Sequence, residues 1–266
     1  MTIRLGTHLV SVPQLLSIAG TLQVPSRSMK LESLLVSRDA ALLAVLRPTL
    51  EKISVQIDVC PESQAGIGLL TKRKFDAVII DCDDLQGASD VLRDLRKTPS
   101  NSKAVAFAVL NGKTTTQEAF RCGANFVLQK PLTPMHATRC FNAALNFMVR
   151  ERRRYFRYSL EIPVRIKVAN SPELTATSTN LSEGGMALRI SGALVKDTVA
   201  AIRFTLPASN TALELKGQVA WTDATGCSGI RFVEVPQSSQ YQLDKWLTER
   251  LQNEMPQHLM AHLSDS

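Results

Sequence analysis

From Leu31 to Arg150, short apolar runs alternate with longer segments in which apolar residues recur every three or four positions. The runs predict strands, and the longer segments predict amphipathic helices. The predicted strands are 33–36, 54–59, 75–80, 104–110 and 125–128. The predicted helices are 40–52, 65–74, 88–97, 116–122 and 134–150. Five such strand–helix units predict an α/β domain, in which a five-stranded parallel sheet has helices on both faces.

After Arg157 the pattern changes to an alternation of apolar and polar residues. The alternating runs, which turn residues separate, are 164–168, 186–190, 202–206, 213–221 and 230–232. Five such runs predict an all-β domain, a small antiparallel barrel with one face buried. A last apolar stripe at helical spacing predicts a C-terminal helix that caps the barrel; its members are Leu243, Trp246, Leu247 and Leu251. Beyond Pro256 we expect a frayed tail.

The length of 266 residues suggests two domains, each large enough for its own core. We place the first domain at 29–149, the second at 150–256 and the tail at 257–266. Residues 1–28 show no clear periodicity, and Met29 begins a stretch that reads like a natural start, so we expect 1–28 to be a flexible extension. Their mildly apolar composition supports a signal peptide only weakly, since no uninterrupted apolar core or cleavage site follows.

Composition is ordinary for a globular protein, at 44% hydrophobic and 21% charged residues. The net charge of +7 favours anionic partners without choosing among nucleic acid, nucleotide and membrane surface. No apolar run approaches the length of a membrane span. The five scattered cysteines form no C-x-x-C pair, which indicates a reducing compartment, and we expect a cytoplasmic protein. No arrangement of residues suggests an enzyme, and His258 and His262 read as solvated tail residues rather than metal ligands.

The junction between the two halves is the stretch from Arg152 to Arg157, which holds four arginines and two aromatic residues. A guanidinium group pairs with phosphate oxygens two at a time, and its flat face stacks on rings. Arginines among aromatics therefore suit a ligand that is both anionic and planar, such as a nucleotide. The alternative is a solvated basic linker. That alternative loses ground because a second motif, 180–185, follows one strand later.

These two motifs together resemble the signature of the PilZ domain, a bacterial receptor for cyclic di-GMP. The first part of the signature, R-x-x-x-R, is matched by Arg153 and Arg157, and the second part, [DN]-x-S-x-x-G, by residues 180–185. A softer match lies at 217–221 and 229–232. The resemblance covers 150–254 and implies that the chain binds cyclic di-GMP. The implied binding residues are Arg152, Arg153, Arg157, Asn180, Ser182, Gly184 and Gly185.

The chemistry of the ligand agrees with these residue types. Cyclic di-GMP has two phosphodiesters and two guanines, and arginine can bridge the O6 and N7 acceptors of guanine or lie over the purine face. Asn180 can read a base edge or hold the turn, and Ser182 offers a hydroxyl. Gly184 and Gly185 let the backbone approach closely or adopt a positive φ. The alternative for this motif is a plain β-turn.

Arg152 directly precedes Arg153, which completes the longer form R-R-x-x-x-R that the family associates with a stacked pair of cyclic di-GMP molecules. We therefore expect two ligands per domain. Arg154 would then point elsewhere, because neighbouring residues of an extended segment face opposite ways. The alternative role for Arg152 is to lie at the C-terminal end of the preceding helix, where a positive charge is favourable.

Residues 31–150 resemble a response-regulator receiver domain, which has a flavodoxin-like fold. The resemblance rests on the stretches 75–81, 123–125 and 128–131. In that family an aspartate at the end of the third strand accepts phosphate, and a lysine after the fifth strand contacts it. Asp81 and Lys130 occupy these two positions. The alternative is that Asp81 is simply a carboxylate paired with Lys130.

Other parts of the receiver chemistry are missing from the sequence. Where the family has an acidic pair that holds Mg²⁺, this chain has Ser37 and Arg38, with Asp39 one place late. Ala108 and Val109 stand where a hydroxyl residue is expected. Mg²⁺ needs carboxylate oxygens, and Arg38 would repel it. We therefore expect no metal and a degenerate receiver, inactive in phosphotransfer, that makes protein contacts.

The sequence predicts a bacterial signalling protein whose PilZ domain binds cyclic di-GMP and passes the signal on by a conformational change. The resemblance implies a protein partner in motility, biofilm or exopolysaccharide control. One alternative is a phosphorylation-driven response regulator with PilZ as its output domain. A second is an interaction scaffold without nucleotide binding. A third is a nucleic-acid binder that uses the basic stretch, a partner that we do not expect.

Overall fold

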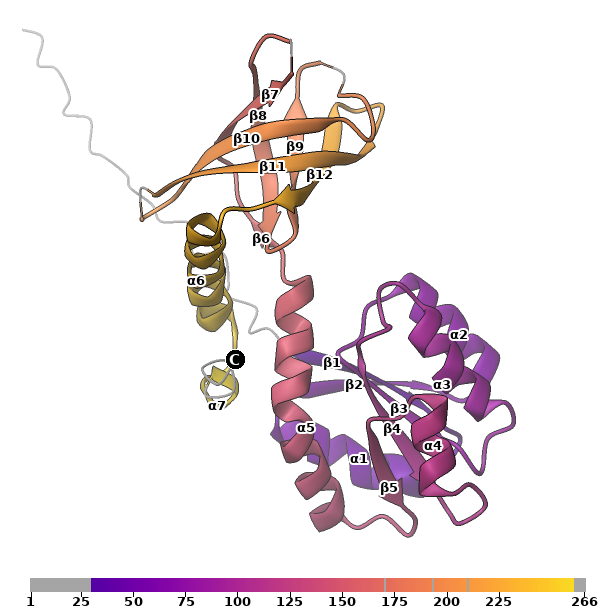
Figure 1. The fold of residues 1–266 in the computed structure, drawn as a ribbon. Helices are drawn as coiled ribbons and strands as arrows, with labels where there is room; N and C mark the ends of the chain where they lie inside the picture. The colour runs from indigo at the N-terminus through magenta and orange to yellow at the C-terminus, as the bar shows by residue number, and fades with distance from the viewer. Residues whose placement is uncertain (1–29, 170, 193, 210, 261–266) are drawn as a thin grey trace, which may run out of the picture.

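The computed structural model describes residues 30–169, 171–192, 194–209 and 211–260. The predicted extension at 1–28 lies outside these ranges, as do residues 261–266 of the predicted tail. The described chain forms an α/β domain and a β-barrel domain, and the long helix α5 (Pro134–Tyr155) leads from one to the other (Figure 1). None of the described helices is both long enough and apolar enough to span a membrane.

The α/β domain is built on a parallel sheet with the strand order β2-β1-β3-β4-β5. Its strands are β1 (Leu31–Val36), β2 (Val55–Cys60), β3 (Ala77–Asp81), β4 (Val105–Leu110) and β5 (Phe126–Gln129). The helices between them are α1 (Ala40–Lys52), α2 (Ser63–Lys72), α3 (Ala88–Lys97) and α4 (Thr116–Cys122). The predicted five-stranded parallel sheet with helices on both faces is confirmed.

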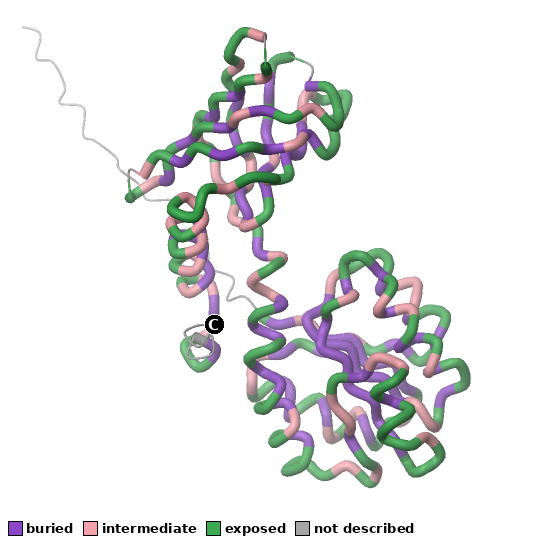
Figure 2. Tube along the Cα trace, in the orientation of Figure 1, coloured by how far each residue is buried: buried purple, intermediate pink, exposed green. Residues whose placement is uncertain are grey.

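Two helical layers cover this sheet, and the buried strands lie between them (Figure 2). Helices α1 and α5 cover one face, where Leu46, Phe107 and Phe141 belong to one apolar cluster. Helices α2, α3 and α4 cover the other face, around Val78 and Leu92. Every residue of β3 and β4 is buried, as expected for central parallel strands. Side chains at the carboxyl ends of the strands therefore meet at one edge of the sheet.

Helix α5 continues to Tyr155, beyond the predicted end at Arg150. No glycine or proline interrupts the segment, and three arginines lie in the last turn, where positive charge complements the helix dipole. The prediction of an extended segment at 152–154 is therefore wrong. Phe156 follows the helix and is buried in the core, so the direction in which the chain enters the barrel is fixed by packing.

The second domain is a closed antiparallel barrel. Its strands are β6 (Tyr158–Ser159), β7 (Pro163–Val168), β8 (Leu174–Ser182), β9 (Gly185–Ile190), β10 (Val199–Leu206), β11 (Thr211–Thr222) and β12 (Cys227–Glu234). The strand order is β6-β8-β7-β10-β11-β12-β9, and a further pairing of β8 with β9 closes the ring. The short strand β6 pairs with the same edge of β8 as β7 does, but farther along β8. The predicted antiparallel barrel is confirmed.

The alternation of apolar residues did not predict the short strand β6 or the longer strand β8. In β8 the reason lies in its buried residues. Two of its buried positions hold Ala176 and Ser178 rather than large apolar residues. The Ser178 hydroxyl donates to the carbonyl oxygen of Leu160 and accepts from the N–H of Ile162 at 3.1 Å. A hydroxyl whose hydrogen bonds are satisfied can be buried at low cost, so a strand rich in serine and threonine serves as a wall of the barrel.

Helix α6 (Gln237–Glu254) packs against the barrel through its predicted apolar stripe, whose members are Leu243, Trp246, Leu247 and Leu251. The indole N–H of Trp246 donates to the carbonyl oxygen of Pro207 at 2.9 Å, and its ring packs edge-on against Tyr158. The predicted C-terminal helix is confirmed. A short helix, α7 (Gln257–Met260), follows and buries Leu259. The prediction of a frayed tail is therefore wrong for 257–260, and His262 lies outside the described residues.

Candidate functional site

The turn between β8 and β9 carries the second predicted motif. Ser182 pairs with Gly185 across the hairpin, and Glu183 and Gly184 form the turn between them. Ser182 is buried, and its hydroxyl donates to the carbonyl oxygen of Gly185 at 2.9 Å. This hydroxyl therefore holds the turn closed. Asn180, at the base of the hairpin, makes no side-chain hydrogen bond with any residue that the structure describes.

The two glycines of the turn differ in what surrounds them. A Cβ atom on Gly185 would lie 2.2 Å from the carbonyl oxygen of Ile230, so β9 and β12 can approach each other only with glycine at this position. A Cβ atom on Gly184 would meet nothing within 4 Å, and Gly184 is exposed. Packing therefore requires glycine at position 185. Packing does not require it at position 184, where glycine leaves the backbone open to a ligand.

Strand β6 brings the first motif to this turn. Tyr158 pairs with Leu181 and Ser159 with Asn180, so Arg157, the residue before β6, precedes this strand on the side of the β8–β9 turn. Arg157 is exposed and Arg153 is half-buried. Neither guanidinium group makes an ion pair or a side-chain hydrogen bond within the described part of the chain. The strand pairing thus brings the end of the first motif toward the second, although the two lie more than twenty residues apart in the sequence, and both arginines remain unengaged within the described chain.

Arg152 lies in the last turn of α5 but is held by the α/β domain. Its Nη2 lies 3.1 Å from Oδ2 of Asp76, 3.6 Å from Oε1 of Glu32 and 2.6 Å from the carbonyl oxygen of Lys30. Only 17% of the Arg152 side chain is exposed. In this arrangement Arg152 is at the end of the helix, which was the alternative role, and it is not grouped with Arg157 at the turn.

The carboxylate that holds Arg152 is itself almost fully buried. Burial raises the pKa of Asp76 to about 6, although Arg152 and the N–H of Glu32, which donates to Asp76 at 2.7 Å, act in the opposite direction. Oδ1 of Asp76 has no hydrogen-bond partner in the part of the chain that the structure describes. Arg152 therefore supplies the main compensating charge for a carboxylate in an unfavourable place.

The neighbouring residues of α5 add to this attachment. Glu151 is buried and forms an ion pair with Lys74, whose ammonium group lies 4.2 Å from the ring centroid of Tyr155. The Tyr155 hydroxyl donates to the carbonyl oxygen of Pro99 at 3.3 Å. Burial lowers the pKa of Lys74, and the ion pair with Glu151 partly restores it. The start of the arginine segment is therefore fixed to the α/β domain at several points.

A cavity of about 580 Å³ opens between the two domains beside the β8–β9 turn. Its lining residues are Pro99, Ser102, Lys103, Arg154, Tyr155, Glu183, Gly184, Gln240 and Asp244. Of the predicted binding residues, only Gly184 is among them. Sequence reasoning missed the contribution of Lys103 and of α6, because no motif in the sequence connects them with the arginine segment.

At the carboxyl edge of the parallel sheet, Lys130 contacts three carboxylates. Its Nζ lies 2.7 Å from Oδ2 of Asp39, 2.9 Å from Oδ2 of Asp81 and 2.8 Å from Oδ2 of Asp84. Burial alone would lower the pKa of Lys130, but the hydrogen bonds to these carboxylates raise it well above its usual range. The expected pair of Asp81 and Lys130 is therefore present, with two further acidic partners.

The structure corrects the sequence argument about Arg38 and Asp39. Asp39 caps α1 through Oδ1, which accepts from the N–H groups of Ala41 and Leu42, while Oδ2 reaches Lys130. Arg38 turns away from the site, and its Nε donates to the carbonyl oxygen of Pro61 at 2.8 Å. The expectation that Arg38 takes the place of an acidic group is therefore wrong, since the N-cap residue supplies the carboxylate.

The side-chain oxygens at this edge are of the type that binds a divalent cation. Oxygen atoms of Asp39, Asp81 and Asp84 lie within 4.8 Å of one another, and carboxylate oxygens are the ligands that Mg²⁺ prefers. Oδ1 of Asp81 is buried with no hydrogen-bond partner in the described chain. These three residues would hold a Mg²⁺ ion, whose charge would neutralise phosphate oxygens. In this structure the Lys130 ammonium contacts all three carboxylates.

Comparison with known protein families assigns both halves. The family model for the response regulator receiver domain matches residues 34–139, and the model for the PilZ domain matches residues 151–249. The chain joins a receiver domain to a PilZ domain. It is therefore a signalling protein that carries a domain of the cyclic di-GMP-binding type. Receiver and PilZ domains are signalling domains rather than enzymes.

Three solved structures illustrate the similarity in fold. The PilZ domain of CeSA from a cellulose-synthesizing bacterium is 21% identical, with 36% of this chain and 97% of that chain covered and a TM-score of 0.31. The Bacillus subtilis inhibitor of motility MotI/DgrA is 21% identical, with 38% and 52% covered and a TM-score of 0.34. The chemotaxis response regulator CheY4 of Vibrio cholerae is 15% identical, with 43% and 98% covered and a TM-score of 0.40. A search of curated proteins gives no match.

Proposed function

We propose that the PilZ domain binds cyclic di-GMP at the β8–β9 turn. The guanidinium groups of Arg153 and Arg157 would bind phosphate or the O6 and N7 atoms of guanine. The free amide of Asn180 would read a base edge, and the open backbone at Gly184 would let the ligand approach. Ser182 and Gly185 would shape the turn. Arg152 would join this site only after leaving Asp76.

One observation carries the proposal. The register of β6 on β8 pairs Tyr158 with Leu181, which supports a position for Arg157 near Ser182, where the end of the arginine segment and the turn would form one surface. Arginine side chains that bind no residue of the described chain keep their donors for a ligand. A solvated basic linker, which was the alternative for this segment, would not require a strand pairing that holds Arg157 at the turn.

Ligand binding would act on the receiver domain through α5. Arg153 lies on the same last turn as Arg152, which is fixed to Asp76. A ligand that pulls on Arg153 and Arg157 would strain or release this attachment, and would change the relative placement of the two domains. The receiver domain would then present or hide a surface for a protein partner in motility, biofilm or exopolysaccharide control.

The five cysteines are all free thiols in the structure. Free thiols are typical of proteins in a reducing compartment, which supports the expectation that the protein acts in the cytoplasm. A cytoplasmic location would also expose the PilZ domain to cyclic di-GMP, which is an intracellular messenger.

Isothermal titration of the full chain with cyclic di-GMP tests the proposal directly. We expect saturable binding, and no comparable binding of cyclic di-AMP, because only guanine offers the adjacent O6 and N7 acceptors. Absence of heat and of any change in a parallel equilibrium dialysis would refute the proposed function. Binding that collapses with added salt and is equally strong for DNA would support the nucleic-acid alternative instead.

A second candidate function gains support from Asp39, whose carboxylate reaches the phosphoacceptor edge. It is a phosphorylation-driven regulator with PilZ as output. We still expect no phosphotransfer, because Lys130 contacts all three carboxylates and Ala108 stands where a hydroxyl is expected. Intact-mass measurement after incubation with acetyl phosphate and Mg²⁺ should show the unmodified chain. A stoichiometric adduct that Asp81→Asn removes would establish the second candidate.

A further inference from the structure

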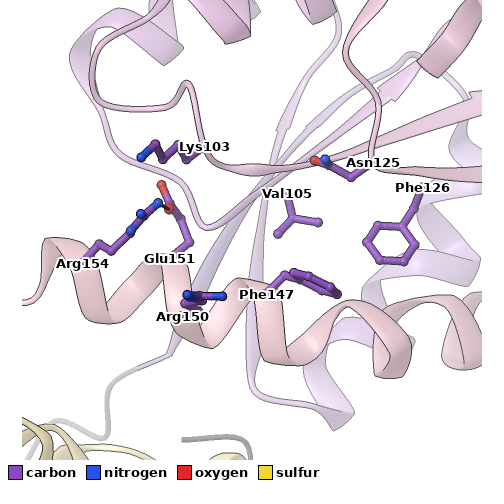
Figure 3. A pocket seen from close by; sticks show the side chains of 8 residues that line it. All are labelled: Lys103, Val105, Asn125, Phe126, Phe147, Arg150, Glu151 and Arg154. Carbon is purple, nitrogen blue, oxygen red and sulfur yellow. Dashed lines mark ion pairs between the residues drawn. The ribbon is translucent and has the colours of Figure 1, made fainter. Parts of the chain in front are cut away.

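A second cavity lies in the receiver domain, beneath the C-terminal half of α5 (Figure 3). Its volume of about 510 Å³ is in the range of small-molecule sites. It is lined by the starts of β4 and β5, by the loop before β4 and by one face of α5. The lining residues are Lys103, Val105, Asn125, Phe126, Phe147, Arg150, Glu151 and Arg154.

One part of this cavity carries uncompensated positive charge. Lys103 and Arg150 are exposed and make no ion pair within the described chain. Arg154 approaches Glu151 only at 3.8 Å. The buried Glu151 carboxylate is shared between Lys74 and Arg154, so Lys103 and Arg150 have no counter-charge in the described chain. A concave surface with this excess of positive charge attracts an anion.

The backbone that carries these cations is held in place. The carbonyl groups on either side of Lys103 accept hydrogen bonds from Arg96 Nη1, at 2.9 Å for Ser102 and 2.8 Å for Ala104. Asn101, in the same loop, is fully buried and donates to the carbonyl oxygens of Leu70 and Arg73. Arg150 and Arg154 lie one turn apart on a rigid helix. A ligand would therefore order the side chains of these cations but not their backbone, which limits the conformational freedom lost on binding.

The other part of the cavity is aromatic. Phe147 is 56% exposed on the same face of α5, and its ring lies edge-on to Phe126 at a centroid distance of 6.1 Å. Figure 3 shows Lys103, Glu151 and Arg154 at one end and Phe126 with Phe147 at the other. An exposed phenylalanine face stacks on any base. Oδ1 of Asn125 is engaged by Arg96 and by the N–H of Ala106, which leaves the Asn125 amino group to donate to a ring nitrogen.

We propose that this cavity binds a purine nucleoside mono- or diphosphate. The base stacks on Phe147, and the phosphates contact Lys103, Arg150 and Arg154. The N-terminal residues 1–29 contain no aspartate or glutamate, so that segment does not complement the charge. The cavity shares Lys103 and Arg154 with the cavity at the β8–β9 turn, so a nucleotide here would lie close to the PilZ domain.

The test uses the full chain with Arg157→Ala, which is designed to disable the barrel site while leaving this cavity unchanged. Titration with the fluorescent N-methylanthraniloyl derivatives of GDP and ADP should show saturable binding of one molecule per chain. Adding Arg150→Ala or Phe147→Ala should weaken this binding at least tenfold. Arg139→Ala removes another exposed arginine of α5 that does not line the cavity, and should leave affinity within twofold of the parent.

Three outcomes would overturn the proposal. The first is an absence of saturable binding. The second is an equal loss in Arg139→Ala, which would indicate attraction to general positive charge. The third is displacement of the probe by a peptide of glutamate and phenylalanine as readily as by GDP, which would assign the cavity to an acidic protein segment. Failure of cyclic di-GMP to bind the wild type would leave this inference intact, because the probe and the substituted residues are different.

Discussion

At the scale of single residues, the arginines at the domain junction have different surroundings. Arg152 is bound to a buried carboxylate, Arg154 lines two cavities, and Arg153 and Arg157 make no ion pair in the described chain. Their spacing in the sequence predicts one shared ligand. Their environments show different roles in this arrangement: Arg152 attaches α5 to the α/β domain, whereas Arg153 and Arg157 can bind a ligand.

Arg157→Ala should weaken cyclic di-GMP binding about a hundredfold or more, because charge-assisted hydrogen bonds worth roughly 3 kcal/mol are lost. The fold should be unaffected, since Arg157 is exposed and makes no contact with another charged group of the described chain. Isothermal titration measures the change. Arg189→Ala, which removes an exposed arginine further along β9, is the control. Equal affinity of the Arg157 variant and the wild type would remove Arg157 from the site.

Arg152→Ala should destabilise the receiver domain in a pH-dependent way. In the folded chain the pKa of Asp76 is raised from 3.8 to about 6, so the contribution of this group to stability is present below about pH 4 and is lost as pH rises through 6. Removing Arg152 raises the pKa of Asp76 further. The free energy of unfolding of the variant therefore continues to fall at pH values above 6, where that of the wild type has levelled off. Urea unfolding should therefore show a small deficit at pH 4.5 and one of about 3 kcal/mol at pH 8.

The matched control for this stability measurement is Arg139→Ala, on the exposed face of the same helix. It should show no deficit at either pH. A deficit in Arg152→Ala that is the same at pH 4.5 and pH 8 would mean that lost packing, rather than the charge on Asp76, accounts for the effect.

At the scale of elements, we expect two adjacent glycines of the β8–β9 hairpin to have different roles: Gly185 in the stability of the barrel and Gly184 in ligand binding. Gly185→Ala places a Cβ atom 2.2 Å from the carbonyl oxygen of Ile230 and should cost about 2 kcal/mol or more of barrel stability. Gly184→Ala meets no atom within 4 Å and should leave stability within about 0.5 kcal/mol. Thermal unfolding measures both. Gly184→Ala should still weaken cyclic di-GMP binding, and unchanged affinity would place the ligand elsewhere.

Most elements follow from the sequence because their apolar period is unambiguous. The limits of the receiver strands agree with the predicted ones to within two residues. Strand β8 could not be predicted in this way, because Ala176 and Ser178 occupy buried positions and carry no apolar signal. The end of α5 was placed too early because charged residues 151–154 break the apolar stripe. In the structure, however, Glu151 and Arg152 are largely buried, because they form ion pairs with Lys74 and Asp76.

The candidate site was predictable only in part for a similar reason. Motif spacing predicted Arg157 and Ser182, and the β6–β8 register pairs the residues next to them, Tyr158 and Leu181. Long-range ion pairs leave no pattern in the sequence, so the contact between Arg152 and Asp76 could not be found. The same holds for Asp39, whose position one residue late is compensated by the geometry of the α1 N-terminus.

At the scale of the whole molecule, the contact between Asp76 and Arg152 should set the affinity for a second nucleotide. The R-R-x-x-x-R form predicts two ligands, but Arg152 must first leave Asp76. Asp76→Asn removes the charge that retains Arg152 and should strengthen the second binding step about tenfold, a coupling of ~1.4 kcal/mol, without changing the first. Titration calorimetry with excess cyclic di-GMP resolves the two steps.

Asp58→Asn, which alters a more exposed carboxylate of the same domain, is the control for this measurement and should behave as the wild type. One nucleotide per chain in both the wild type and Asp76→Asn would refute the stacked pair and leave Arg152 with its role at the helix end.

Small-angle X-ray scattering of the same samples should show a ligand-dependent change in domain placement, and identical profiles would argue against the proposed transmission through α5.

The continuity of α5 also bears on how such a protein can be divided or recombined. The helix buries Phe141, Leu145 and Met148 against the receiver sheet, and the same helix carries Arg152 and Arg153 at its other end. A fragment that starts at Phe156 leaves these arginines behind, whereas one that starts at Pro134 carries an apolar helix without its sheet. A cut after Arg150 keeps the apolar face with the receiver and the arginines with the barrel, but it divides α5 and separates Glu151 and Arg152 from their partners Lys74 and Asp76. Exchange of either domain against a homologue should therefore keep α5 together with its contacts to Lys74 and Asp76.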